Sequence, residues 1–312
     1  TKIWTGDGND DRNLTNDGNS DLQPDFLWDK RRSTTGSHKL IDSNRGVTKP
    51  LSTNNTNAEG SESNAVQAFQ TDGFQVGNDS NINGNGVTYV AWQWKANGGT
   101  TASNSNGSIT STVQANTTAG FSIVTFTGNT TAGATVGHGL GVAPDYVQVR
   151  RFDRSGDAWR GFWSPLGNEK YLELNATDAQ QDSTTGAWND TSPTSSVFSL
   201  GSAAGINGGS MIAYCFASIP GYSKIGSYFG NGNADGPFVY TGFKPAWLMI
   251  KVFNGNTGGW DMYDNKRGSY NGQISMLQAN ASASEATSDG VDFLSNGFKI
   301  RHTSGNQNGN GN

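Results

Sequence analysis

The chain has 312 residues, of which 33% are hydrophobic, 11% aromatic and 15% charged, and its formal net charge is −5 at pH 7. This composition excludes a disordered chain, which would be more highly charged and poorer in aromatic residues. Slight acidity without a strongly basic stretch argues against nucleic acid as a partner. No apolar run reaches the roughly 18–20 residues of a membrane span, so we expect no membrane insertion.

Four landmarks occur three times along the chain, always in the same order. The first is a Gly/Asn-rich turn, which begins at Gly6, Gly128 and Gly230. The second is a proline followed by a strand-like run that ends near a cation, and it begins at Pro24, Pro144 and Pro245. The third is a Leu-x-x-Asn pair, Leu51/Asn54, Leu172/Asn175 and Leu277/Asn280, and the fourth is the phenylalanine Phe74, Phe198 or Phe298. Such a repeat predicts three related structural units.

Composition suggests where the units begin and end. We expect unit 1 in residues 1–95, unit 2 in 120–218 and unit 3 in 219–312. Residues 96–119 contain almost no large apolar side chain, which is typical of a linker or of an exposed strand and turn. Units 1 and 2 continue into apolar runs at 88–94 and 211–216, whereas unit 3 stops in a Gly/Asn turn. We therefore expect the final strand of unit 3 to lie beyond residue 312 or to come from another molecule.

The apolar residues alternate with period two, as in 89–94 and 121–126, which predicts strands with one buried face. Gly and Asn punctuate these runs and suit tight turns. The expected fold is all-β, with three tandem units that resemble β-sandwiches or jelly rolls, and a propeller-like arrangement is less favoured. We expect most tryptophans to lie in the core, including Trp28, Trp92, Trp94 and Trp247.

Few residues suggest chemistry. His38, His138 and His302 lie in different units at unrelated landmarks, and we expect loop histidines that are either solvent-exposed or held by a single hydrogen bond. The lone Cys215 cannot form a disulfide within the chain.

Carboxylates suggest two kinds of site, and both have simpler explanations. Asp7, Asn9 and Asp11 alternate like calcium ligands, but Gly18 stands where a calcium loop needs Glu, which favours a surface turn. Asp25, Asp145 and Glu173 are candidates for glycoside hydrolysis, yet Asp145 repeats Asp25 within the landmark, which favours a structural role. We therefore assign no catalytic, cofactor-binding or metal-binding residue and expect no cofactor and no enzyme activity.

Paired cations follow two of the prolines, as Lys30-Arg31-Arg32 and Arg150-Arg151. They could face anionic glycans or the carboxylates of a neighbouring subunit, or they could form a solvated edge that prevents unwanted strand pairing.

Three stretches resemble a repeated domain of unknown function in large virion proteins of marine bacteriophages, which are often tail fibres. They are QPDFLWDKRRSTTGSHKLIDSNRGVTKPLSTN (23–54), FQTDGFQVGNDSNINGNGVTYVAWQWKA (69–96) and VGHGLGVAPDYVQVRR (136–151). The chain departs from the pattern at the middle loop 162–165, at Ala246 in place of Asp, and at the missing final strand. The family brings no established catalytic residues.

The resemblance implies a non-enzymatic virion structural protein, a segment of a tail fibre or surface fibre that contacts host glycans. It would be assembled in the host cytoplasm and exposed on the particle. A homo-oligomer, with a trimer favoured, or contact with other virion proteins would cover its edge strands. A capsid decoration or extracellular filament protein without a receptor role is the main alternative, and an enzyme that acts on polysaccharide is a lesser one.

Overall fold

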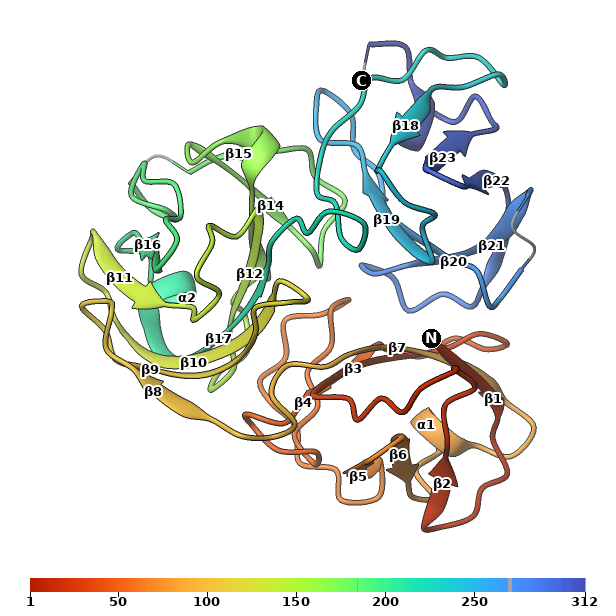
Figure 1. Ribbon diagram of the computed structural model, residues 1–312, viewed down its shortest axis with the longest axis horizontal. Coiled ribbons are helices and arrows are strands. Elements are labelled where there is room, and N and C mark those ends of the chain that lie inside the picture. The colour runs from red at the N-terminus through yellow and green to blue at the C-terminus, as the bar shows by residue number, and fades with distance from the viewer. Residues whose placement is uncertain (184, 269–270, 312) are drawn as a thin grey trace.

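The computed structural model describes residues 1–183, 185–268 and 271–311, and it is nearly all β (Figure 1). The structure confirms the all-β class. The strands form several separate sheets, consistent with sandwich-like units. In the described part of the chain, no helix is long and apolar enough to cross a membrane.

Unit 1 is a sandwich of two antiparallel sheets. One sheet has the order β1-β7-β3-β4, formed by Lys2–Thr5, Thr88–Trp94, Phe26–Arg31 and Lys39–Asp42. The other has the order β2-β6-β5, formed by Arg12–Leu14, Gly73–Val76 and Val66–Gln70. A one-turn helix, α1 (Ser80–Asn83), leads into β7.

Unit 2 repeats this plan with a larger sheet. Its order is β15-β14-β13-β12-β17-β10-β9-β8, formed by Gln181–Asp182, Lys170–Glu173, Arg160–Trp163, Tyr146–Arg151, Gly208–Phe216, Phe121–Asn129, Ser111–Asn116 and Ala102–Asn104. The second sheet pairs β11 (Ala134–Gly137) with β16 (Val197–Leu200), and the short helices are η1 (Ser164–Leu166) and α2 (Ala204–Asn207). Because β9 pairs with β10 of unit 2 and β8 pairs with β9, the segment 96–119 contains strands and is not merely a linker.

Unit 3 has one continuous sheet of order β18-β23-β22-β21-β20-β19. Its strands are Phe238–Tyr240, Gly297–Ile300, Ala286–Leu294, Gln273–Gln278, Trp260–Asp264 and Trp247–Lys251. The helix α3 (Gly305–Asn308) follows β23, as α1 follows β6 and α2 follows β16. In units 1 and 2 the last strand, β7 or β17, pairs with β3 or β12, but in the described part of unit 3 no strand pairs with β19 on that side.

A buried asparagine fixes each Gly/Asn-rich turn. Asn83, Asn207 and Asn308 end the three short helices and are all fully buried. The Asn207 side chain accepts from the Asn129 backbone N–H and donates to the Thr131 and Gly201 carbonyl oxygens. Asn83 and Asn308 make equivalent bonds to the turns after Gly6 and Gly230.

Glycine is required where each turn meets its helix. A Cβ on Gly128 would lie 2.3 Å from the Asn207 carbonyl carbon and 2.4 Å from the Gly208 nitrogen. Gly6 and Gly230 approach the corresponding backbone just as closely. The recurring Gly and Asn of the sequence are thus two halves of one packing contact.

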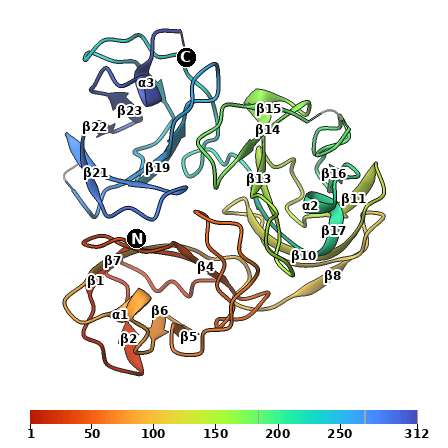
Figure 2. The ribbon, with the colours of Figure 1, turned by 180° about the vertical axis from the view of Figure 1, so that it is seen from behind.

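The three units are arranged around a common centre in a closed ring, which Figures 1 and 2 show from opposite sides. Each unit has a core of its own, and a further core is shared by all three. Alternate residues of one strand therefore enter different cores: Leu27 packs inside unit 1, whereas Phe26 and Trp28 pack in the shared centre.

The prediction of one buried face is accordingly wrong for β3 and β7, because the ring covers their second face. Six tryptophans are buried, with exposures of 8% or less, which confirms that most tryptophans lie in the core: Trp4, Trp28, Trp92, Trp159, Trp188 and Trp260. Of those named from the sequence, Trp94 and Trp247 are only half-buried and pack against the shared core.

Candidate functional site

The three interfaces of the ring use the same hydrogen bond. Trp159 Nε1 in unit 2 donates to the Ser52 carbonyl oxygen in unit 1 at 2.8 Å, and Trp260 Nε1 in unit 3 donates to the Glu173 carbonyl oxygen in unit 2 at 3.1 Å. At the third interface, between units 3 and 1, His38 Nε2 in unit 1 lies 2.9 Å from the Gln278 carbonyl oxygen in unit 3. Each acceptor directly follows the leucine of the Leu-x-x-Asn landmark. That landmark is therefore a contact between units.

Backbone hydrogen bonds clasp each interface in a second place. The amides of Glu59, Gln180 and Glu285 donate to the carbonyl oxygens of Phe152, Phe253 and Arg32 at 2.8, 2.9 and 2.7 Å. These carbonyls occupy the eighth position after the landmark proline in their units. Because backbone bonds need no particular side chain, sequence comparison alone could not reveal this contact.

The cation at the sixth position after each proline also crosses an interface. Lys30 Nζ donates to the Ser282 and Ala283 carbonyl oxygens, Arg150 donates to Asn57 O, and Lys251 Nζ donates to Thr177 O. Lys30 and Arg150 are fully buried, so the expectation of a solvated edge is wrong for both. Burial lowers the pKa of Lys30 to about 8 and that of Lys251 to about 8.

At two of the interfaces, a buried aspartate accepts a hydrogen bond from a side chain on the last strand of the next unit. Asp42 accepts from Arg45 and from the hydroxyl of Tyr214 on β17, and burial together with Asp42 raises the pKa of that hydroxyl. Asp264 accepts from Arg267 and from Trp92 Nε1 on β7. Burial opposes ionisation of Asp264, but the Arg267 guanidinium holds its pKa below the ordinary value.

The third interface differs at this position. Trp163 pairs with Tyr146 in unit 2, as Asp42 pairs with Phe26 in unit 1 and Asp264 with Trp247 in unit 3. An indole therefore replaces the carboxylate where unit 2 meets unit 3. The altered middle loop of the sequence is the source of this change.

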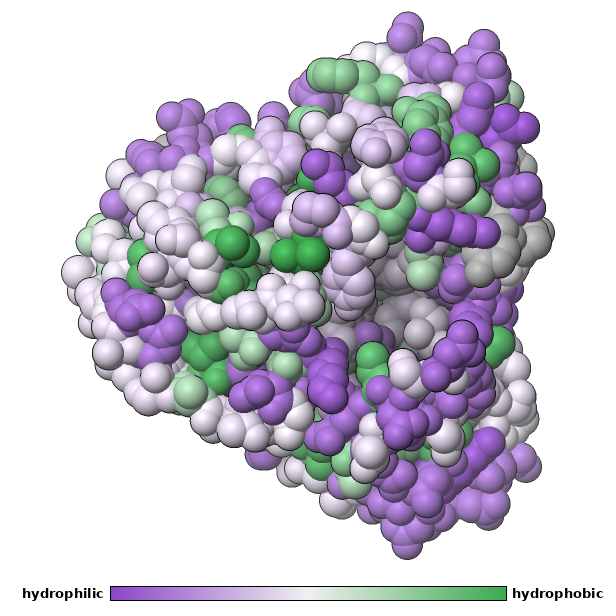
Figure 3. Space-filling view, in the orientation of Figure 1, coloured by the Kyte–Doolittle hydropathy of each residue, from purple (hydrophilic) through white to green (hydrophobic). Residues whose placement is uncertain are grey.

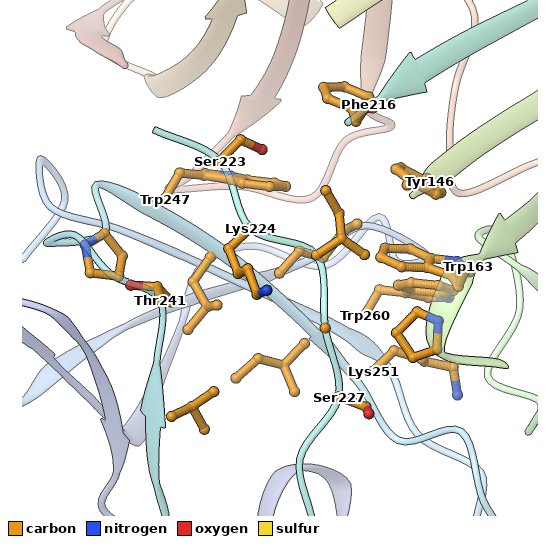
Figure 4. Close-up of a pocket in the computed structure, with 18 of the residues that line it drawn as sticks. Tyr146, Trp163, Phe216, Ser223, Lys224, Ser227, Thr241, Trp247, Lys251 and Trp260 are labelled. Atoms are coloured by element: carbon orange, nitrogen blue, oxygen red, sulfur yellow. The ribbon is translucent and has the colours of Figure 1, made fainter. Parts of the chain in front are cut away.

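A cavity of about 460 Å³ lies at this interface, beside the unpaired side of β19 (Figure 4). Its aromatic wall from unit 2 contains Tyr146 and Trp163, whose ring centroids are 4.0 Å apart, and Trp163 stacks on Trp260 of β20 at 5.6 Å. Met249 and Lys251 of β19 also line it, and so does the segment 222–228. We call this cavity the β19 groove.

The groove lies at the position that the last strand occupies in units 1 and 2. In unit 1, β7 lies between β1 and β3, and in unit 2, β17 lies between β10 and β12. The segment 226–229 directly precedes Gly230, as β1 (Lys2–Thr5) directly precedes Gly6, and it therefore corresponds to β1. In unit 3 the corresponding space, between 226–229 and β19, is the groove.

The three histidines are buried and each ring makes two hydrogen bonds, so the expectation of loop histidines that are solvent-exposed or held by a single hydrogen bond is wrong. His38 Nδ1 accepts from Trp28 Nε1 at 2.8 Å, which makes Nε2 the donor to Gln278. His138 and His302 also make two hydrogen bonds each, within units 2 and 3. Burial lowers the pKa of His38 to about 3.

The candidate carboxylates have structural partners. Asp25 accepts the backbone N–H groups of Ala96, Gly98 and Gly99, just after β7, and Asp145 accepts that of Ser218, just after β17. These contacts agree with the structural role expected of the repeated aspartate. Asp7 accepts from Asn9 N and Asn83 Nδ2 within the unit 1 turn, and Glu173 bonds to Arg160.

A family model described as a domain of unknown function, DUF7483, matches residues 1–312. The chain belongs to this family. The match covers all three units of the ring and thus treats them as one domain. No curated protein and no solved structure matches the chain.

Proposed function

We propose that the chain is a non-enzymatic structural module of a bacteriophage virion, a segment of a tail fibre or surface fibre that contacts host glycans or neighbouring virion proteins. It would be assembled in the host cytoplasm and exposed on the particle. The resemblance of its landmarks to virion proteins supports the phage context. The closed ring supports the structural role.

The proposal rests on one observation: the side chains that could take part in catalysis make structural hydrogen bonds instead. His38, Lys30 and Arg150 hold the interfaces, and Asp25 and Asp145 hold the segments that leave the last strands. His38, Lys30, Arg150 and Asp25 are fully buried and Asp145 is half-buried, and all five bond to backbone or to structural side chains. Such a module resists deformation because its titratable groups hold its parts together.

Unit 3 carries an exposed aromatic surface that suits assembly. Phe229, Tyr240 and Phe238 have exposures of 73%, 66% and 46%. By strand register, Phe238 corresponds to Asn13 in unit 1 and Thr135 in unit 2, and Phe229 precedes Gly230 as Thr5 precedes Gly6. The face shown in Figure 3 is mostly hydrophilic or neutral, with hydrophobic residues in small groups. Exposed aromatic patches of this kind mark contact surfaces.

Glycan-array binding with the purified chain tests the receptor role, and electron microscopy of antibody-labelled particles tests the virion location. We expect labelling of an appendage and binding to a restricted set of glycans. Labelling without glycan binding would instead favour a decoration or filament protein. Release of reducing ends from host polysaccharide would overturn the non-enzymatic role. A solution mass well above 33 kDa would support an oligomer, for which a trimer remains our proposal.

A further inference from the structure

We propose that unit 3 binds one neutral sugar residue, at the end of a host glycan, in a second cavity between β20, β21 and α3. The cavity has a volume of about 220 Å³, and we call it the Asp261 pocket. Its polar lining residues are Asp261, Gln278, His302, Ser304, Asn306 and Gln307. Ser304 is exposed and Gln278 and Asn306 are half-buried, so the pocket opens to solvent on their side. The inference rests on the proposed glycan contact and gives that contact a place in the chain.

The floor of the pocket is a buried hydrogen-bond network. Asp261, His302 and Gln307 are 7% exposed or less. Asp261 Oδ1 accepts from Gln278 Nε2 at 2.8 Å, and Asp261 Oδ2 accepts from Gln307 Nε2 at 2.6 Å. His302 Nδ1 accepts from Ser304 N, so Nε2 carries the proton and donates it to Gln307 Oε1 at 2.9 Å. The polar groups of the floor are therefore held in fixed directions before a ligand binds.

The acid of the pocket stands where the other units carry a cation. Asp261 corresponds to Lys39 and Arg160, because each directly follows the residue whose ring N–H crosses an interface. Lys39 is paired with Glu62, and Arg160 is paired with Glu173. A carboxylate can accept about four hydrogen bonds, and the two amides give Asp261 only two. Asp261 therefore keeps the capacity to accept hydrogen bonds from a ligand.

The helix beside the pocket carries a polar residue in place of an apolar one. Gln307 directly precedes the buried Asn308, where units 1 and 2 have the fully buried Ile82 and Ile206. Burying an amide costs free energy unless its polar atoms are paired. The Gln307 nitrogen donates two hydrogen bonds and its oxygen accepts one. In unit 3 a position of the apolar core has thus become part of a polar wall.

His302 stands where the other units cannot carry a side chain. The Asn308 side chain donates to His302 O, as the equivalent asparagines donate to the carbonyl oxygens of Gly77 and Gly201. A Cβ on Gly77 would lie 2.5 Å from Asn64 O, and one on Gly201 would lie 2.2 Å from another backbone oxygen. The step from the landmark phenylalanine to the buried asparagine is one residue longer in unit 3, which makes room for the imidazole. The pocket therefore arises from changes inside unit 3 and does not depend on the space beside β19.

These groups favour a neutral ligand with several hydroxyl groups. Hydroxyls donate to a carboxylate, and they both donate to and accept from amides. Burial raises the pKa of Asp261, and the nearby charge of Lys251 opposes this rise. Because Lys251 already balances part of its negative charge, Asp261 attracts a further cation only weakly, whereas it repels an anion. The charges at the pocket thus select against ions of either sign.

The size of the pocket and its one apolar lining residue fit a single sugar residue. Met276 offers an apolar surface to the C–H groups of a sugar ring. The volume of about 220 Å³ lies below the range of about 300–1,000 Å³ that is typical of pockets for drug-sized ligands. The pocket therefore suits the end of a glycan chain and not an extended oligosaccharide.

Monosaccharides test the proposal with the chain of residues 1–312. The probes are the methyl glycosides of glucose, galactose, mannose and N-acetylglucosamine, and the comparison ligands are methylammonium and N-acetylneuraminic acid. Ligand-observed NMR detects binding, and a titration gives the Kd. We expect at least one neutral glycoside to bind with a Kd of about 1 mM, and neither charged ligand to bind. Binding should shift the ring signals of His302 and leave those of His38 unchanged.

Two variants place the sugar in the pocket. Asp261→Asn removes the charged acceptor but keeps the shape of the side chain, and it should weaken binding about tenfold. Gly259→Ala should also weaken binding, because its Cβ would lie 2.3 Å from Gln278 Nε2 and would push this amide away from Asp261. Ser37 and Ala158 occupy the position of Gly259 in units 1 and 2, so the fold tolerates a side chain there.

The matched control is Asp235→Asn. Asp235 is an exposed carboxylate of unit 3 that pairs with Lys299 and does not line the pocket. This variant should bind the sugar as the native chain does. If Asp261→Asn failed to fold, Gly259→Ala would still decide the question, because it leaves the carboxylate unchanged.

Other outcomes would overturn the proposal. Absence of binding by every glycoside, or binding of a charged ligand alone, would refute a neutral sugar site. Native-like binding by both variants, or unchanged ring signals of His302, would place the sugar elsewhere. Glycan-array binding that persists in Asp261→Asn and Gly259→Ala would overturn this inference alone and leave the proposed glycan contact in place. Antibody labelling of particles tests the virion location separately.

Discussion

Replacing Asn207 with alanine should destabilise the fold because this side chain joins its own segment, at Gly201, to the turn at Asn129 and Thr131, which lie 78 and 76 residues away in sequence. The variant loses the bond from Asn129 N at 3.0 Å and those to the carbonyl oxygens of Thr131 and Gly201 at 3.0 and 2.9 Å. Leaving one buried polar group without its partner costs about 1–3 kcal/mol. Water can reach the exposed Asn129 and Thr131, but Gly201 is buried. We therefore expect a loss of about 3 kcal/mol in the free energy of unfolding.

Equilibrium unfolding in urea, followed by tryptophan fluorescence, measures this loss. The matched control is Asn106→Ala at an exposed position, for which we expect a change within about 0.5 kcal/mol. Asn83→Ala and Asn308→Ala should resemble Asn207→Ala, because these residues hold the equivalent turns. If Asn207→Ala were as stable as the control, the three buried asparagines would not be the devices that fix the repeat.

Three further changes probe the cores and the ring. Gly128→Ala should cost about 2–3 kcal/mol, because its Cβ would meet the backbone at Asn207, whereas Gly18→Ala, with only ordinary contacts, should be nearly neutral in the same urea assay. Trp92→Ala should cost on the order of 3–5 kcal/mol and Trp92→Phe less, and an unchanged melting temperature of the alanine variant would contradict burial in the shared core. Burial lowers the pKa of His38 to about 3, so the unfolded chain binds more protons at this site between about pH 6.5 and 3, and stability should fall as the pH is lowered through that window. Protonation of this histidine in the unfolded chain should lower the free energy of unfolding by about 2 kcal/mol at pH 5, relative to neutral pH. A His38→Gln variant whose free energy of unfolding depends on pH just as steeply would refute the assignment.

The all-β class could be predicted because apolar alternation and Gly/Asn-rich turns recur along the chain. The proline, Leu-x-x-Asn and phenylalanine landmarks mark equivalent places in the three units, and alternation in residues such as Tyr89–Trp94 indicates strands. Alternation alone cannot show whether the second face meets water or another unit. The burial of both faces of β3 and β7 therefore required the structure.

The ring itself and the β19 groove were only partly visible in the sequence. The repeated cation at Lys30 and Arg150 is visible in the sequence, but its acceptors are backbone carbonyls, which leave no mark in a sequence. His38 does not look equivalent to Trp159 and Trp260, because the side chain differs, although all three donate a ring N–H across an interface and a backbone N–H to the landmark asparagine. The altered loop at Trp163 is recognisable in the sequence, yet only the fold places it beside β19 in the groove.

Hydrogen exchange at the interface between units 3 and 1 tests the closed ring most directly. The amides of Gly36 and Glu285 donate across this interface to Ser282 O at 2.9 Å and Arg32 O at 2.7 Å. An extended array would keep the other two interfaces but not this one. Residue-resolved exchange should show Gly36 and Glu285 protected as strongly as Glu59, which donates across the interface between units 1 and 2. Exchange of both amides at the rate of an open loop, with Glu59 still protected, would contradict the ring.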